Sequence, residues 1–186
     1  MIDFHISNEE YLNDLMELVR PFESRTDVDL KLDVDYFRQK NAIRISIYSD
    51  SFDNFQKHYT FSIYSKDELE RKRKEKRFLK IAIYRTLSFL TGVNLPYGCL
   101  TGIRPTKLFL EIQNDFKDYG KGAREVFIDD YSVSEGKVNL VEKIVNVQAP
   151  IRNKSSKEYD VFVFIPFCPT RCAYCSFVSL PIDKQR

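Results

Sequence analysis

Near the N-terminus, three segments alternate apolar and polar residues with a period of two. They cover residues 28–34, 43–47 and 59–63, and a short apolar segment at 2–6 precedes them. Successive side chains of a β-strand point to opposite faces of a sheet, so this alternation predicts strands with one buried face. The spacing and the turn residues between the last two segments favour an antiparallel sheet with helices on one face.

Helical spacing of apolar residues predicts a helix after the first strand. Asn8 is suited to cap its N-terminus, and Pro21 is expected to end it near residue 20 because proline cannot continue the helical hydrogen bonds. Shorter helices are predicted at 105–114, 121–130 and 134–147.

The longest predicted helix covers residues 66–91. Ser65 and Glu68 have the S-x-x-E spacing of a capping box, and Gly92 suits the position after the last turn. The second half of this helix is apolar, so it is expected to cover the sheet. The fold class is therefore α+β, with a small antiparallel sheet and helices on one of its faces.

The first half of the long helix carries a run of cations over residues 71–77. Such a run invites a nucleic-acid interpretation. Acidic residues are interleaved with it, and pairs such as Glu70 and Lys74 have the i,i+4 spacing of helical ion pairs. A solvated helix face with internal ion pairs explains the run better, and nucleic-acid binding remains the weaker alternative.

The composition changes after residue 150. We predict an N-terminal α+β accessory domain at 1–150, a linker at 151–158, and the start of a second domain at 159–186. Residues 159–165 form a nearly continuous apolar run, which is typical of a strand buried on both faces in a parallel sheet. The second domain is expected to be incomplete in this chain.

The overall composition is that of a globular protein. The 186 residues are 43% hydrophobic and 30% charged, and the net charge of +2 gives no field that would attract nucleic acid. No apolar run is long enough to span a bilayer, and the N-terminus lacks the features of a signal peptide. We therefore expect a cytoplasmic protein without a membrane partner. In that compartment, four cysteines favour metal or redox chemistry over disulfides.

Three of the four cysteines lie close together. Cys168, Cys172 and Cys175 have the spacing C-x3-C-x2-C. Three thiolates on one loop suit three irons of a [4Fe–4S] cluster and leave the fourth iron without a protein ligand. Zinc is the alternative, but zinc prefers four ligands, and the fourth would have to be the distant Cys99 or one of two histidines.

Other candidate residues carry weaker signals. Tyr174, directly before the third cysteine, is expected to shield the cluster from solvent. Arg104 and Lys107 could meet an anion at the start of a helix, as part of a substrate site or a contact between domains. A structural turn with solvated cations explains the same two residues. Cys99 is predicted to be a small apolar core residue, and no side chain is assigned a catalytic role.

The run at 165–177, Ile-Pro-Phe-Cys-Pro-Thr-Arg-Cys-Ala-Tyr-Cys-Ser-Phe, resembles the radical S-adenosylmethionine superfamily. Within it, the run is similar to the oxygen-independent coproporphyrinogen III oxidase (dehydrogenase) group. The segment Leu-Thr-Gly-Ile-Arg-Pro-Thr-Lys at 100–107 resembles the N-terminal extension of one branch of that group.

This resemblance implies a (β/α) barrel, of which the chain holds the first strand and the cysteine loop. It implies that Cys168, Cys172 and Cys175 bind a [4Fe–4S] cluster and that S-adenosylmethionine chelates the fourth iron. One electron, from a donor that the sequence does not identify, would cleave the adenosylmethionine to methionine and a 5′-deoxyadenosyl radical. In the family's best-known reaction this radical attacks a propionate side chain of a tetrapyrrole in heme biosynthesis.

The chain departs from the oxidase pattern at three positions. It has Phe162 where the oxidase has tyrosine, Phe164 where it has histidine, and Phe177 where it has a fourth cysteine. Oxidation of coproporphyrinogen III is therefore one interpretation, and handling of heme is another. The chain is expected to be an inactive N-terminal fragment of a radical S-adenosylmethionine oxidoreductase. The alternative is a substrate-recruiting or heme- or partner-binding module without oxidase activity.

Overall fold

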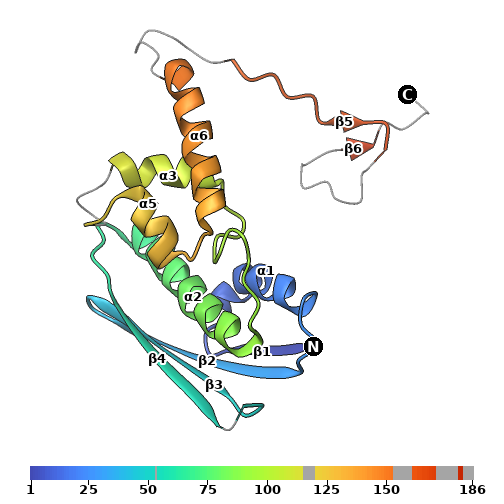
Figure 1. Cartoon of the computed structure of the whole chain (residues 1–186), viewed down its shortest axis with the longest axis vertical. Helices are drawn as coiled ribbons and strands as arrows, with labels where there is room; N and C mark the ends of the chain where they lie inside the picture. Colours follow the sequence, from blue (N-terminus) through green and yellow to red (C-terminus); the bar gives the residue numbers. More distant parts are fainter. Residues whose placement is uncertain (53, 115–119, 153–160, 171–179, 182–186) are drawn as a thin grey trace. The chain divides into compact units, whose positions relative to one another are not determined.

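A computed structural model describes residues 1–52, 54–114, 120–152, 161–170 and 180–181 (Figure 1). The chain divides into two compact units, Met1–Gln148 and Ala149–Arg186. Each unit is described here by itself.

The first unit contains a four-stranded sheet with the strand order β1-β2-β3-β4. The strands are β1 (Ile2–Ile6), β2 (Leu30–Gln39), β3 (Ala42–Ser49) and β4 (Phe55–Ser62). β2, β3 and β4 pair in antiparallel register as predicted. β1 instead pairs with β2 in parallel, because the register runs from Ile2 opposite Leu30 to Ile6 opposite Val34. The sheet is therefore mixed, and the prediction of an antiparallel sheet is wrong for β1. A helix connects β1 to β2, and such a crossover brings the second strand back in the same direction.

This connecting segment begins with the short 3₁₀ helix η1 (Glu9–Tyr11), which continues as α1 (Leu12–Glu23). Asn8 accepts a hydrogen bond from the backbone N–H of Glu10 at 3.0 Å, which confirms its role as a cap. The expectation that Pro21 ends the helix is wrong, because Pro21 lies inside α1. The next residue, Phe22, is fully buried and packs edge-on against Tyr84 at 5.7 Å, and this packing holds the last turn in place.

The long helix α2 (Glu68–Thr91) lies with α1 on one face of the sheet (Figure 1). Gly92 ends it in the left-handed conformation, with φ at +70°, as predicted. The predicted capping box is displaced by two residues. Asp67 accepts a hydrogen bond from the N–H of Glu70, whose carboxylate accepts one from the N–H of Lys66.

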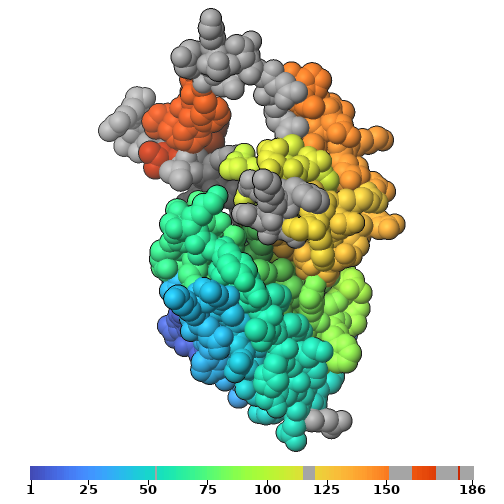
Figure 2. All heavy atoms as spheres, turned by 90° about the vertical axis from the view of Figure 1, so that its left-hand side faces the viewer, coloured from blue at the N-terminus to red at the C-terminus, as the bar shows by residue number. Residues whose placement is uncertain are grey.

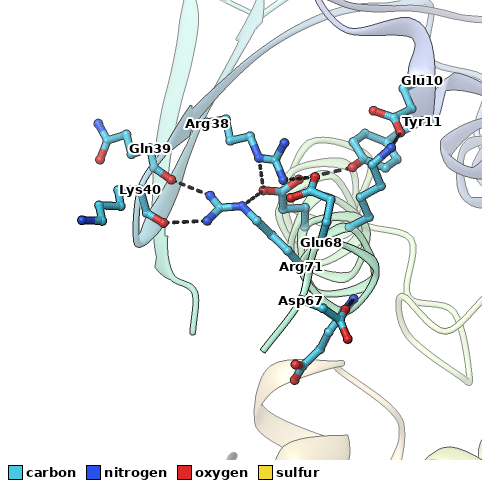
Figure 3. A network of polar contacts seen from close by, with 11 residues as sticks. Glu10, Tyr11, Arg38, Gln39, Lys40, Asp67, Glu68 and Arg71 are labelled. Carbon is cyan, nitrogen blue, oxygen red and sulfur yellow. Dashed lines mark hydrogen bonds and ion pairs between the residues drawn. The ribbon is translucent and has the colours of Figure 1, made fainter. Parts of the chain in front are cut away.

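A buried carboxylate on α2 ties this helix to the sheet (Figure 3). Glu75 is 1% exposed, and one of its oxygens accepts hydrogen bonds from Arg71 Nε at 2.8 Å and Arg38 Nε at 2.9 Å. Arg71 also donates to the carbonyl oxygens of Gln39 and Lys40 at the end of β2. Glu75 was expected on a solvated face, whereas it is the centre of an internal ion network.

The remaining helices among the described residues follow a turn-rich connector. They are α3 (Pro105–Asn114), α5 (Ala123–Glu125), the π-helical turn η2 (Val126–Asp130) and α6 (Glu135–Arg152). Phe127 of η2 packs edge-on against Phe109 of α3 at 5.1 Å and against Tyr131 at 5.9 Å. α6 extends beyond the predicted end at residue 147. Of the helices described, none has the length and apolarity that a membrane crossing requires.

In the second unit, two short strands are described, β5 (Phe167–Cys168) and β6 (Leu180–Pro181), which pair in parallel. Residues 161–165 form no strand, and their side chains are exposed, for example Val161 at 87% and Ile165 at 73%. The predicted buried strand is therefore not confirmed in this chain. Such a strand needs neighbours on both edges and both faces, and no described strand of this unit pairs with 161–165.

Candidate functional site

The cysteine loop starts on a short strand pair. Cys168 is the second residue of β5 and lies opposite Pro181 of β6. The N–H of Leu180 donates to the carbonyl oxygen of Pro166 at 2.8 Å. The chain thus returns beside Cys168 after residue 179. The Cys168 side chain is half-buried, and its thiol is free.

The other predicted residues of this loop, Cys172, Tyr174 and Cys175, lie outside the described residues. Within the described part of the chain, no three histidine, cysteine or acidic residues are grouped as metal ligands. The fit of an iron–sulfur cluster therefore rests on the chemistry of the donor set. Three thiols close together in the sequence, of which one is on a partly accessible strand end, are ligands that such clusters use.

Cys99 lies apart from this set. It is 2% exposed and belongs to the hydrophobic core of the first unit, which confirms the prediction of an apolar core residue. Burial raises the pKa of its thiol to about 12, so the sulfur stays protonated at neutral pH. A protonated thiol inside a core is a poor ligand, and this weakens the zinc alternative that used Cys99.

The structure places Arg104 and Lys107 on the wall of a cavity of about 490 Å³. The cavity lies among α1, α2 and the start of α3, and we refer to it as the basic cavity. Its cationic lining residues are Arg73, Lys76, Arg77, Lys80, Arg104 and Lys107, and its acidic ones are Asp14, Glu17 and Glu111. The cations outnumber the acids, so the cavity favours an anionic group.

Two contacts shape the wall of the basic cavity. Lys80 is 5% exposed and donates to both the carbonyl and the hydroxyl oxygen of Thr101, at 3.0 and 2.9 Å. Burial lowers the pKa of Lys80 from its ordinary value. Gly102 turns the connector with φ at +65°, and a Cβ there would lie 2.8 Å from a carboxylate oxygen of Glu17. The positive φ favours glycine at this position, whereas the flexible Glu17 side chain could move aside.

The sequence interpretation placed the whole basic run on a solvated face. In the structure, some of its cations form surface ion pairs and others line the basic cavity. Lys74 pairs with Glu70 at 2.9 Å, as predicted, and Lys72 pairs with Glu10 at 2.6 Å. Arg73, Lys76 and Lys80 instead face the basic cavity. These residues are three or four positions apart, which is the spacing of one helix face and would have been the available signal.

Of three comparisons with known proteins, one supports the family resemblance. No family model matches the chain, and no solved structure matches it. The chain is nevertheless related to the coproporphyrinogen-III oxidase-like proteins, as the resemblance predicted. It is 31% identical over 134 residues to "Oxygen-independent coproporphyrinogen-III oxidase-like protein HemZ" of Bacillus subtilis (strain 168).

The match covers 70% of this chain and 26% of the HemZ protein. The chain thus spans about a quarter of the length of this curated relative. The comparison supports a relationship to a HemZ-like protein. The activity, the substrate and the partners of a whole protein remain to be proposed.

Proposed function

We propose that the chain is the N-terminal portion of a radical S-adenosylmethionine oxidoreductase of heme metabolism. The observation that carries this proposal is the C-x3-C-x2-C motif in a chain related to a coproporphyrinogen-III oxidase-like protein. Since the chain spans 26% of that relative, we expect it to hold a cluster without turning over substrate by itself.

In this proposal Cys168, Cys172 and Cys175 hold a [4Fe–4S] cluster, and Tyr174 shields it from water. When bound, the cluster supplies an open iron for S-adenosylmethionine and the electron that cleaves it. Pro166 and Pro169 flank the first cysteine and remove backbone donors there, so the loop is stiff and the remaining N–H groups are free for the sulfurs.

The substrate class that we propose is a tetrapyrrole with carboxylate side chains, as the name of the relative suggests. Of the three departures from the oxidase pattern, all phenylalanines, two lie among the described residues, and both are exposed. Phe162 and Phe164 are 85% and 51% exposed, and their rings stack at 6.2 Å. They stand where the oxidase pattern has a tyrosine and a histidine. A phenylalanine side chain has no proton to transfer, so neither position takes part in proton transfer in this proposal. Coproporphyrinogen III and heme are the two candidates that this leaves.

Anaerobic reconstitution of the chain with iron and sulfide tests this proposal. We expect about four irons and four sulfides per chain, with the broad visible absorbance of an iron–sulfur cluster. Cys168→Ala, Cys172→Ala and Cys175→Ala should each lose most of this iron, whereas the matched control Cys99→Ala should keep it. Equal iron content in all four variants, or tight binding of zinc in place of iron, contradicts the proposal.

A second candidate function is a binding module for an anionic ligand, and the basic cavity favours it. Arg104 and Lys107 are exposed and lie on the connector and at the start of α3, and α2 contributes four further cations to the cavity. Titration with citrate as a small tricarboxylate probe should show salt-dependent binding that the double variant Arg104→Gln/Lys107→Gln weakens about tenfold. Lys143→Gln, which lies on α6, is the control. If the double variant binds as the unmodified chain does, the two cations are only part of a solvated turn.

A further inference from the structure

A second cavity, of about 560 Å³, lies on the other side of α2, next to the edge strand β4. Figure 2 faces this side of the molecule, where the teal and green surfaces of β4 and α2 lie beside the yellow surface of α5. We call it the aromatic cavity. Its main lining residues are Phe61, Phe78, Arg77, Arg85, Asp130 and Tyr131. None of them was predicted as a site residue from the sequence.

One wall of the aromatic cavity is a row of parallel rings. Phe61 of β4 and Phe78 of α2 stack at 4.5 Å with an angle of 12° between their planes. Tyr59, also on β4, lies 6.3 Å from Phe61 and is nearly parallel to it at 3°. Phe61 and Phe78 are only half-buried, although they pack on the core. Partly exposed flat rings that line a cavity favour a flat apolar ligand, because rings stack with an offset.

Cations surround this wall. Lys66, Lys74, Arg77 and Arg85 line the cavity, against two carboxylates, Glu70 and Asp130. Both carboxylates already have cationic partners, since Glu70 pairs with Lys74 at 2.9 Å and Asp130 pairs with Lys121 at 3.3 Å.

Among the described residues, backbone carbonyl groups rather than a carboxylate hold the guanidinium of Arg85 in position. It donates to the backbone carbonyl oxygens of Asp129 at 2.7 Å and of Asp130 at 3.4 Å. Arg77 lies over the ring of Tyr131, 5.7 Å from its centre. Carbonyl oxygens orient the Arg85 guanidinium but do not cancel its charge, so this side chain is preorganised to meet an anion.

The volume of the aromatic cavity lies in the range of about 300–1,000 Å³ that is typical of small-molecule sites. We propose that this cavity binds a flat, largely apolar ring system that carries carboxylates, with the rings against Phe61 and Phe78 and a carboxylate at Arg85. The choice of a tetrapyrrole carboxylate within this class rests on the proposed function. The cavity would then collect the substrate at a place separate from the cysteines in the sequence.

Fluorescence titration of the full chain with coproporphyrin III tests the inference. This probe is planar and carries four carboxylates, and its tetramethyl ester is a matched ligand without their charge. We expect saturable binding of the acid at one site per chain and at least about tenfold weaker binding of the ester.

Three variants locate the site. Phe61→Leu keeps an apolar side chain without a ring, Arg85→Gln removes the held cation, and Lys66→Gln removes an exposed cation of the same cavity. The first two should weaken binding about tenfold and the third about threefold. Arg20→Gln, an exposed cation on α1, is the control and should bind normally. Lys66→Gln keeps the test valid if Arg85→Gln is destabilised.

The triple variant Cys168→Ala/Cys172→Ala/Cys175→Ala separates this inference from the proposed function. It should bind coproporphyrin III as the unmodified chain does, even though it holds no cluster. The inference is overturned if the chain does not bind coproporphyrin III, if the ester binds equally well, or if Phe61→Leu and Lys66→Gln leave the affinity unchanged.

Discussion

Glu75 is a carboxylate in the interior of the first unit, and its partners come from separate elements. Arg38 is on β2, Arg71 is one helical turn before it on α2, and Tyr11 donates its hydroxyl at 3.3 Å from η1. Burial and then the Glu75 carboxylate raise the pKa of Tyr11 far above its ordinary value, so this hydroxyl remains a donor over the whole working range of pH. The network fixes the angle of α2 across the sheet.

Replacement of Glu75 should be strongly destabilising. Glu75→Gln leaves two guanidinium groups beside a neutral side chain, and loss of one partner from a buried ion network costs about 3 kcal/mol. Urea unfolding of the full chain measures this loss. The control Glu9→Gln is exposed and should change stability by less than about 0.5 kcal/mol. Equal effects of the two substitutions would show that the network contributes little.

Because of the Cys99 thiol, the free energy of unfolding should fall as the pH rises above 9. The folded state holds the thiol pKa at about 12, above its ordinary value of 9.0. Above pH 9 the unfolded chain therefore releases this proton while the folded chain retains it, so stability falls as pH rises. Between pH 8 and pH 10 the unmodified chain should lose about 1 kcal/mol more than Cys99→Ala does, in urea unfolding under reductant. Parallel pH profiles of the two proteins would contradict this account.

At the scale of elements, the connector between α2 and α3 depends on one glycine. Gly98 has φ at +54°, and a Cβ there would lie 1.9 Å from the carbonyl oxygen of Tyr131. That oxygen already accepts a hydrogen bond from the N–H of Cys99 at 3.0 Å, so the two segments are held together by backbone contact. The approach positions the connector that carries the residues of the basic cavity.

Two glycine variants separate this contact from backbone conformation. Gly92 also has a positive φ, but a Cβ there would meet nothing within 4 Å. Gly92→Ala should cost about 1 kcal/mol for the left-handed conformation alone, and Gly98→Ala should cost more than about 3 kcal/mol because the segments must separate. Thermal unfolding measures both. Similar losses in the two variants would mean that the connector moves aside at little cost.

Most elements of the first unit could be predicted from periodicity, and the errors have physical reasons. The alternation over 28–34 identified β2 but contains no information on the direction of its neighbour, so the parallel pairing of β1 was missed. The local sequence predicts that Pro21 ends the helix. The burial of Phe22 in the core instead keeps the last turn of α1 helical. Asp67, rather than Ser65, caps α2 because Glu70 reaches back to the N–H of Lys66.

At the scale of the whole molecule, the sequence identifies the cysteine motif, whereas the two cavities are seen only in the structure. The cysteine motif is local in the sequence, so spacing alone identified it. The basic and aromatic cavities combine residues from distant segments, for example Phe61 with Asp130, and only the fold brings these together. The apolar run at 159–165 has the composition of a buried strand, but its burial depends on partners that composition cannot supply.

In the proposed cluster, three cysteines hold three irons and the fourth iron has no protein ligand. Controlled oxidation of the reconstituted cluster tests this arrangement most directly. An iron that lacks a thiolate is the first to leave, so mild oxidation should release about one iron per chain and leave a three-iron cluster with its own electron paramagnetic resonance signal. The Cys99→Ala protein should behave identically. Retention of all four irons after oxidation, or a chain that takes up zinc alone, would contradict the claim.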